Sequence, residues 1–145
     1  GSNDRLFSGA GNDTLNASVG KGGNRLYGGL GDDLFFSGNN DRLIGGNGND
    51  QFFFPNGSAN STATGGAGAD RFQVKDPDLR LGTNTITDFT SGEDTIAIAG
   101  VEANFGDVVF TSIDEGTLIS LNGEDLAILL GVKANSLNEG DLTFA

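Results

Sequence analysis

Three nine-residue stretches decide the fold: GGLGDDLFF at residues 28–36, GGNGNDQFF at 45–53 and GGAGADRFQ at 65–73. A fourth stretch, SGAGNDTLN at residues 8–16, departs from their shared frame only in its first residue. The frame is G-G-x-G-x-D-x-U-x, in which U is a large apolar residue. Degenerate copies alternate with these four along residues 1–74. Such internal repetition indicates a stack of similar coils around one continuous core.

Each position of the frame has a physical role. Glycine at the first, second and fourth places permits backbone conformations and close approaches that a Cβ would forbid. The x-U-x triplet predicts a three-residue strand whose U side chain points inward while its two neighbours point outward. The inward column then reads Leu6, Leu15, Leu26, Phe35, Leu43, Phe52, Ala63 and Phe72. We therefore predict an all-β fold, a parallel β-roll (β-solenoid), in which each nonapeptide forms half a coil.

The frame resembles the RTX (repeats-in-toxin) repeat, which binds Ca²⁺. Four near-perfect copies make this resemblance specific over residues 1–73. It implies a right-handed roll in which each ion lies between adjacent coils, held by Asp carboxylates and main-chain carbonyls. An oxygen-only shell of this kind suits Ca²⁺. By the same resemblance, the carbonyls come from Gly9, Gly11, Gly29, Gly31, Gly46, Gly48, Gly66 and Gly68.

The alternating half-coils place the sixth position of the frame on two different edges of the roll. On the first edge every copy is clean, and the sixth positions are Asp13, Asp33, Asp50 and Asp70. The second edge holds every insertion, deletion and replacement, and its sixth positions are Asp4, Asn24, Asp41 and Ser61. We predict a regular column of Ca²⁺ between successive first-edge aspartates. The second edge should bind fewer or weaker ions.

The proximity of these carboxylates predicts folding that depends on metal. Stacked strands lie about 4.8 Å apart, and two carboxylates at that distance repel by about 3 kcal/mol at an effective dielectric near 20. The inward apolar column is too short to offset this repulsion and the ordering of the chain alone. We expect folding to be coupled to the binding of roughly three to five Ca²⁺ ions. The alternative is a Gly-rich linker or a metal-free solenoid, although a linker would need no apolar column.

One outward face of the roll combines cations with aromatic rings. On the second-edge half-coils, the seventh position supplies Arg5, Arg25 and Arg42, and the ninth position supplies Phe7 and Tyr27. The arginine stems can simply cover apolar surface. The same face can instead bind an acidic glycan or a partner domain. Both interpretations remain open at the level of sequence.

The second half reads as a β-rich C-terminal capping segment. We predict a connection over residues 75–84 and a cap over residues 85–145. Strand patterns occur at residues 85–89, 95–99, 108–111, 117–121, 126–130 and 142–144. Asn122-Gly123 predicts a hairpin turn, and helical turns are expected after Val101 and at residues 134–137.

Two stretches of this second half extend the resemblance to RTX proteins. Residues 86–100, ITDFTSGEDTIAIAG, resemble the segment that follows the repeats, and residues 129–145 resemble the extreme C-terminus. This implies that the region caps the roll, nucleates its calcium-driven folding and carries an uncleaved type I secretion signal. Asp88 and Asp94, which flank Gly92, predict a further calcium site at the junction, with a salt bridge in the turn or plain solvation as the alternatives.

Composition excludes several function classes. The net charge of −12 opposes binding to nucleic acid. No apolar run is long enough for a transmembrane segment, and no N-terminal signal pattern is present. The chain has no His and no Cys, which removes the commonest general base and the thiol nucleophile. We therefore expect no catalytic residue and no enzyme activity.

The leading hypothesis is a calcium-binding RTX module of a larger exported bacterial protein, secreted or at the cell surface. It would stay unfolded where free Ca²⁺ is low, pass through a type I exporter and fold outside the cell. The alternative is a calcium-dependent polysaccharide-binding or adhesin module. Its partner would be an acidic polysaccharide or an upstream domain of the same chain. A third possibility is a purely structural spacer.

Overall fold

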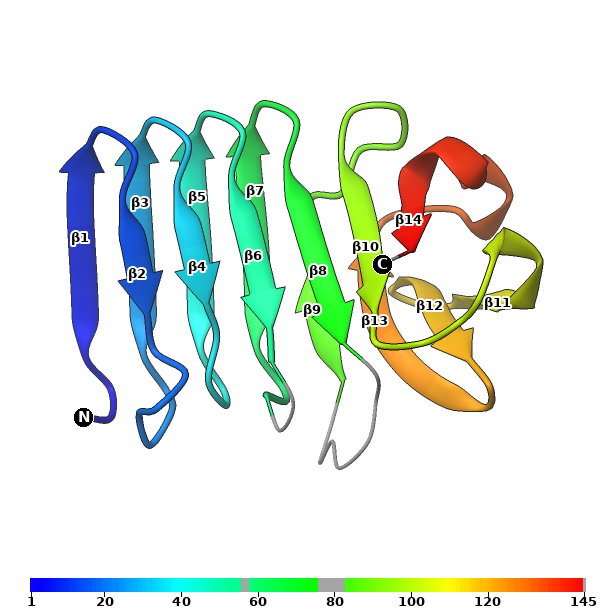
Figure 1. Cartoon of the computed structure of the whole chain (residues 1–145), viewed down its shortest axis with the longest axis horizontal. Coiled ribbons are helices and arrows are strands. Elements are labelled where there is room, and N and C mark those ends of the chain that lie inside the picture. The colour runs from blue at the N-terminus through cyan, green and yellow to red at the C-terminus, as the bar shows by residue number, and fades with distance from the viewer. Residues whose placement is uncertain (56–57, 76–82, 145) are drawn as a thin grey trace.

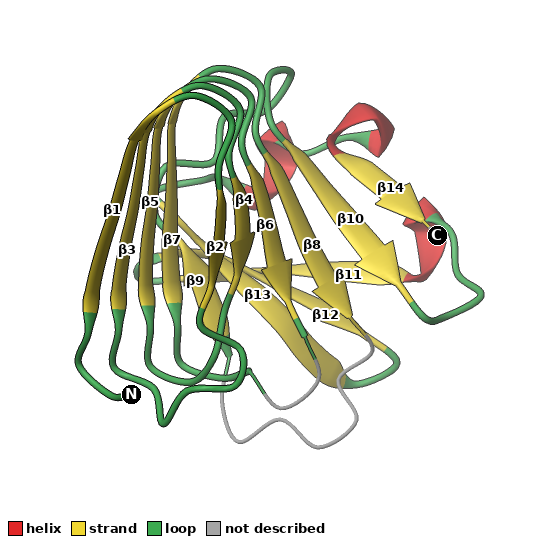
Figure 2. Cartoon of the chain, turned by 60° about the vertical axis from the view of Figure 1, so that its left-hand side comes forward, coloured by secondary structure: helices red, strands yellow, loops and turns green. Residues whose placement is uncertain are grey.

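The computed structural model describes residues 1–55, 58–75 and 83–144. It confirms an all-β roll of stacked parallel coils with a β-rich cap (Figure 1). One wall of the roll contains β1 (Arg5–Ala10), β3 (Arg25–Leu30), β5 (Arg42–Asn47), β7 (Thr62–Ala67) and β9 (Asn84–Ile86). The other wall contains β2 (Thr14–Asn16), β4 (Leu34–Phe36), β6 (Gln51–Phe54), β8 (Arg71–Lys75), β10 (Thr95–Ala99) and β14 (Leu142–Phe144). The two walls face each other across the core (Figure 2).

The inward column predicted from the U positions forms the core, except that Leu6 is 37% exposed, because β1 is the outermost strand of its wall. Parallel register pairs Leu26 with Leu43 in one wall, and Phe35 with Phe52 in the other. Both pairs are fully buried. The rings of Phe35 and Phe52 stack with centroids 4.7 Å apart, and Phe72 continues the stack at 4.9 Å. This spacing equals the distance between neighbouring strands, so each coil adds one ring to a continuous column.

The strands of the first wall are longer than the predicted triplets. Strands β1, β3, β5 and β7 each contain six residues, because they continue through the second glycine of the frame. Gly9 pairs with Gly29, and Gly29 pairs with Gly46, in the same parallel register as the residues before them. Gly29 has φ 119°, and a Cβ there would overlap the carbonyl oxygen of Gly9. Glycine is therefore required in the strand itself, and not only in the turn.

The cap extends both walls of the roll. An antiparallel meander consists of β11 (Val108–Ile113), β12 (Gly116–Leu121) and β13 (Glu124–Leu130). Strand β13 pairs in parallel with β9 in one wall, and β14 pairs in parallel with β10 in the other. The predicted hairpin turn joins β12 to β13, with φ 54° at Asn122 and 81° at Gly123. Positive values at both positions are typical of a tight two-residue hairpin.

The cap seals one end of the core. Ile119, Leu121 and Leu129 are buried in the same apolar cluster as the phenylalanine column. At the opposite end, by the N-terminus, β1 is the outermost strand of its wall (Figure 1). Within the described ranges, no helix is long and apolar enough to cross a membrane.

Most predicted cap strands match the observed ones, with two differences. The pattern at residues 85–89 yields only β9, because Thr87 and Asp88 turn away to bond with the preceding coil. Short 3-10 turns occur at Phe105–Asp107 and Ala134–Ser136, near the predicted places, and a third at Glu139–Asp141 was not predicted. Of the predicted connection over residues 75–84, residues 76–82 lie outside the described ranges. The division into 1–74, 75–84 and 85–145 stays a prediction.

Candidate metal centre

The first-edge aspartates form a hydrogen-bonded ladder along the turns at the top of Figure 1. Each Oδ1 atom accepts a hydrogen bond from the backbone N–H of the aspartate one coil earlier. Asp13 N–H donates to Asp33 at 2.8 Å, Asp33 N–H to Asp50 at 2.8 Å, and Asp50 N–H to Asp70 at 2.9 Å. Asp70 N–H donates in the same way to Asp94 at 2.9 Å. Asp94 therefore continues the predicted column as its fifth member.

The second oxygen of these carboxylates is buried and unpaired. Four Oδ2 atoms have no hydrogen-bond partner within the described part of the chain: those of Asp13, Asp33, Asp50 and Asp70. Asp50 itself is fully buried. A buried carboxylate oxygen without a partner is strongly unfavourable unless a cation neutralises it. The unpaired atoms fall in one column, on the edge that the sequence predicts to bind Ca²⁺.

Main-chain carbonyls converge on these oxygens. A Cβ built on Gly28 would overlap Asp33 Oδ2 and lie 2.7 Å from the carbonyl oxygen of Gly45. A Cβ on Gly45 would likewise overlap Asp50 Oδ2 and lie 2.5 Å from the carbonyl oxygen of Gly65. A carboxylate oxygen and a carbonyl oxygen of the next coil thus meet above Gly28 and above Gly45. The Gly45 and Gly65 carbonyls are candidate ligands that the sequence prediction missed, although the glycine at the first position of three copies was a signal.

The glycines predicted as carbonyl donors also direct oxygens between the coils. Cβ atoms placed on Gly29 and Gly31 would overlap the carbonyl oxygens of Gly9 and Gly11 in the preceding coil. The same relation holds for the carbonyl oxygens of Gly29, Gly31, Gly46 and Gly48 toward the coil that follows each. Oxygen atoms are therefore abundant between coils, as Ca²⁺ requires. The metal-binding role of these six glycines, and of Gly66 and Gly68, stays a prediction.

A second ladder, which the sequence prediction missed, runs beside the first in the opposite direction. Asn12 Oδ1 accepts a hydrogen bond from Asp32 N–H at 2.9 Å, and Asp32 Oδ1 accepts one from Asn49 N–H at 2.7 Å. Asn49 Oδ1 then accepts from Ala69 N–H at 2.8 Å. These residues occupy the fifth place of the frame. Each turn is therefore tied to the coil before it by position six and to the coil after it by position five.

The second edge is built differently, because its side chains bond to protein atoms. Asp4 N–H donates to Asn24 Oδ1, and Asp41 N–H donates to Ser61 Oγ. Asp41 uses both oxygens: Oδ1 accepts from Asn24 N–H at 2.8 Å and Oδ2 accepts from Gly38 N–H at 2.6 Å. Among the described residues, this edge leaves no buried side-chain oxygen unpaired. The geometry agrees with the expectation of fewer ions there, which stays a prediction.

Asp88 and Asp94 have separate places at the junction with the cap. Asp94 joins the first-edge ladder, and its Oδ2 accepts a hydrogen bond from Thr90 N–H at 2.8 Å. Asp88 accepts from Gly65 N–H at 2.9 Å and from Gly66 N–H at 2.8 Å, one bond to each oxygen. Asp88 therefore closes the glycine turn of the last clean copy. Of the two, only Asp94 occupies a position equivalent to the repeat aspartates.

Burial opposes negative charge on this edge. Desolvation raises the pKa of Asp50 to about 6, and the neighbouring carboxylates Asp33 and Asp32 add to the rise. Desolvation raises the pKa of Asp70 to about 7, with further contributions from Asp94, Asp50 and Asp88. Burial also raises the pKa of Asp94. Negative charge is therefore unfavourable on Asp50, Asp70 and Asp94, the three aspartates of the ladder nearest the cap, and a divalent cation would offset this cost.

The described residues contain no group of three or more His, Cys, Asp or Glu side chains suited to hold a metal. A metal shell on the first edge would instead combine carboxylates of successive coils with main-chain carbonyls. Such a set offers oxygen ligands only, which favours Ca²⁺ over Zn²⁺ or Cu²⁺. The residues of the first edge therefore fit Ca²⁺.

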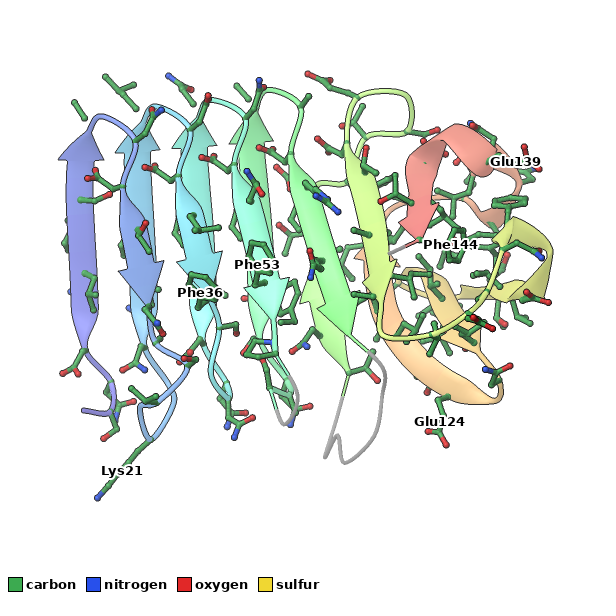
Figure 3. The ribbon with its side chains drawn as sticks, in the orientation of Figure 1. Lys21, Phe36, Phe53, Glu124, Glu139 and Phe144 are labelled. Carbon is green, nitrogen blue, oxygen red and sulfur yellow. The ribbon has the colours of Figure 1, made fainter. Side chains whose placement is uncertain are left out.

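The predicted partner face lies on the outside of the first wall. Register places Arg5, Arg25 and Arg42 side by side, and all three are exposed. None of them forms an ion pair with another described residue. The rings of Phe7 and Tyr27 stack beside this row, with centroids 4.6 Å apart and planes 5° from parallel. The opposite wall carries a second stacked pair, Phe36 and Phe53 (Figure 3).

Comparisons with known proteins found a matching family and similar solved structures. The sequence model of a family described as "Peptidase M10 serralysin C terminal" matches residues 3–129. The AlgE6R3 subunit of the mannuronan C5-epimerase from Azotobacter vinelandii is similar in structure, with 25% identity and a TM-score of 0.38. The match covers 95% of this chain and 81% of that one. The AlgE6R2 subunit has 21% identity and a TM-score of 0.43, over 100% of this chain and 91% of that one. No curated protein matches the sequence.

Proposed function

Because the chain belongs to the serralysin C-terminal family of RTX β-rolls, we propose that it folds on binding Ca²⁺ outside the cell and supports type I secretion of a larger protein. Members of this family are non-catalytic, calcium-binding modules of secreted proteins. The observation that carries the proposal is the column of buried, unpaired Oδ2 atoms on the first edge. Each is an anionic ligand without a hydrogen-bond partner among the described residues.

The proposed ions lie between successive members of the first-edge ladder. The four intervals are Asp13 to Asp33, Asp33 to Asp50, Asp50 to Asp70, and Asp70 to Asp94. Ca²⁺ would supply positive charge to each interval, while carboxylate and carbonyl oxygens of this chain supply the ligands. The second edge needs no ion for this purpose, since its polar atoms are paired by Asn24, Asp41 and Ser61.

The same chemistry would keep the chain unfolded before export and fold it afterwards. Without metal, the first-edge carboxylates repel one another and oppose coil stacking. The chain therefore stays extended where free Ca²⁺ is low, as passage through a narrow exporter requires. Extracellular calcium modules commonly have dissociation constants of about 10⁻⁴ to 10⁻³ M. Folding outside the cell would then follow from the rise in Ca²⁺ concentration alone.

Circular dichroism in a chelator, followed by addition of excess Ca²⁺, tests metal-coupled folding. We expect little β signal with chelator and a cooperative gain of β signal with Ca²⁺. Mg²⁺ at the same concentration is the control, because it requires a smaller octahedral shell and gives up water reluctantly. A β spectrum that is the same with and without chelator contradicts the proposal. Deletion of the residues that follow Val101 in the full-length parent protein tests the export role, and undiminished secretion contradicts it.

A second candidate function is calcium-dependent binding of an acidic polysaccharide. The row of Arg5, Arg25 and Arg42 supports it, because these three adjacent cations form no ion pair with a described residue and repel one another until an anion binds. The stacked rings of Phe7 and Tyr27 add an aromatic surface suited to sugar rings. A polyanion with regularly spaced carboxylates would match a row that repeats once per strand.

A glycan array with and without Ca²⁺ tests this second function. We expect retention of acidic glycans only with Ca²⁺, and its loss in the Arg25→Ala, Tyr27→Ala double variant. Arg71→Ala is the matched control, because Arg71 lies on the opposite wall. Unchanged retention by the double variant would eliminate the arginine face as the binding site. A pure spacer would show neither retention nor an export defect.

A further inference from the structure

Asp141 is a buried carboxylate at the end of the chain, with every bond directed at the cap or the last repeat turn. It is 1% exposed. Its Oδ2 accepts a hydrogen bond from Asn138 N–H at 2.9 Å, which closes the 3-10 turn before β14. Its Oδ1 accepts from Gly92 N–H at 3.0 Å, and Ser91 Oγ lies 2.8 Å from its Oδ2. Two of these partners are about 50 residues away in the sequence.

The chain contains a second copy of the same local motif without these distant bonds. Residues Asn104 to Asp107 read N-F-G-D, and residues Asn138 to Asp141 read N-E-G-D. In both, the Asn side chain caps the turn and the Asp side chain accepts from the Asn N–H. Asp107, however, is exposed, and among the described residues its side chain bonds to Asn104 alone. Turn formation therefore does not explain why Asp141 is buried.

The partners of Asp141 belong to the loop that carries the fifth rung of the first-edge ladder. In this loop, Asp94 N–H donates to Thr90 O at 2.8 Å and Thr90 N–H donates to Asp94 Oδ2. Asp94 Oδ1 then accepts from Asp70 N–H. Asp141 is thus connected through Ser91 and Gly92 to the side chain that closes the last interval of the column.

We propose that Asp141 is a positioning residue that fixes the 90–94 loop and so sets the calcium affinity of the interval between Asp70 and Asp94. This inference rests on the proposed calcium function of the first edge. Gly92 has φ 85°, a conformation with little intrinsic rigidity in a glycine. Without Asp141 the loop would have to be ordered by the ion itself, and that ordering would weaken binding.

If Asp141 has this role, docking of the C-terminal strand and metal binding at the last interval are thermodynamically coupled. Strand β14 pairs with β10, which begins immediately after Asp94. When β14 docks, Asp141 enters the loop and Asp94 is held in line with Asp70. By linkage, an ion in this interval must stabilise the docked C-terminus by the same free energy. Within the described parts of the chain, the side chain of Asp141 has no hydrogen bond to any other interval of the column.

Asp141→Asn and its matched control Asp107→Asn separate this role from a general structural one. The rate of backbone amide hydrogen exchange in saturating Ca²⁺ is measured at two positions of the first-edge ladder. Asp70 N–H is held by Asp94, and Asp33 N–H is held by Asp50. We expect Asp141→Asn to speed exchange at Asp70 by about tenfold and to leave Asp33 unchanged. Calorimetry should show about tenfold weaker binding of one ion, and Asp107→Asn should match the wild type in both measurements.

Equal acceleration at Asp70 and Asp33, or no acceleration at either, overturns the inference. If Asp141→Asn fails to fold even in Ca²⁺, Ser91→Ala removes one of the same bonds and carries the test with a smaller expected change. A wild-type chain that binds no Ca²⁺ refutes the proposed function itself. A wild-type chain that binds Ca²⁺, with unchanged affinity in both variants, refutes only the role of Asp141.

Discussion

Asp50 Oδ1 accepts a hydrogen bond from the backbone N–H of Asp33 at 2.8 Å, while Oδ2 of the same carboxylate is buried without a partner in the described chain. One oxygen therefore joins two coils through protein atoms alone. The other is free to bind the proposed Ca²⁺. In the proposed calcium-bound roll, a single repeated aspartate therefore sets the coil register through Oδ1 and makes the stack dependent on metal through Oδ2.

Asp50→Asn should weaken calcium binding while preserving the register. The amide oxygen still accepts from Asp33 N–H, but the NH₂ group that replaces Oδ2 is a donor and cannot be a metal ligand. We expect calorimetry to show the loss of at least one ion, and circular dichroism to show a higher Ca²⁺ midpoint. Asp41→Asn is the control for an aspartate on the second edge. It should leave the number of bound ions unchanged, because both Asp41 oxygens already accept hydrogen bonds from backbone N–H groups.

Acidification should have opposite effects on the metal-free and calcium-bound rolls. Burial raises the pKa of Asp50 to about 6 and that of Asp70 to about 7, from 3.8. A raised pKa means that the charged form is penalised in the fold, so the penalty is present above pH 7 and is relieved as pH falls through 7 and 6. The metal-free roll should therefore gain β structure between about pH 8 and pH 5.

Protons and Ca²⁺ compete for the same carboxylates, so the apparent calcium affinity should fall over the same pH window. Circular dichroism in chelator and Ca²⁺ titrations, each at about pH 8 and pH 5, measure both effects. A Ca²⁺ midpoint that does not move between these two values is inconsistent with burial-shifted carboxylate ligands.

Gly45→Ala should disrupt calcium binding by steric overlap alone. Gly45 does not have a positive φ, so alanine introduces no backbone strain there. Its Cβ, however, would overlap Asp50 Oδ2 and approach Gly65 O to 2.5 Å. We expect a clear rise in the Ca²⁺ midpoint of folding. Gly106→Ala in the cap, where a Cβ would lie 3.2 Å from Asn104 Oδ1, should leave that midpoint unchanged; similar shifts in both variants would argue against the site above Gly45.

Phe52→Ala and Phe53→Ala should differ although the residues are adjacent. Phe52 is fully buried between Phe35 and Phe72, so its removal should lower the free energy of unfolding by about 3–5 kcal/mol. Phe53 stacks on Phe36 on the outward face of its wall, and removal of the Phe53 ring should lower the free energy of unfolding by about 1 kcal/mol. Urea unfolding in saturating Ca²⁺ gives both values. Equal losses would mean that the inward and outward positions are wrongly assigned.

The sequence was sufficient for the coils because the repeat contains two independent periodicities. The nine-residue frame predicts the turns, and the alternation within x-U-x predicts which side chain enters the core. Together they gave the pairing of Leu26 with Leu43 and of Phe35 with Phe52. The row of Arg5, Arg25 and Arg42 follows from the same register.

Contacts that depend on backbone orientation or on distant segments were not predictable from the repeat. The carbonyls of Gly45 and Gly65 turn toward the carboxylates only in the folded coil. The position-five ladder was missed because Asn and Asp at an exposed place are common in turns. Asp141 reaches Gly92 across 49 residues, and the local N-E-G-D motif gives no sign of that contact.

The first-edge ladder tolerates coils of different length. Its successive rungs are 20, 17, 20 and 24 residues apart, yet each makes the same bond. In the described loops the variation lies at the opposite edge, where eight residues join β2 to β3 (17–24) and five join β4 to β5 (37–41). Foreign peptides grafted into those loops would therefore be displayed at a pitch of about 4.8 Å, with Ca²⁺ serving as the switch that assembles the display.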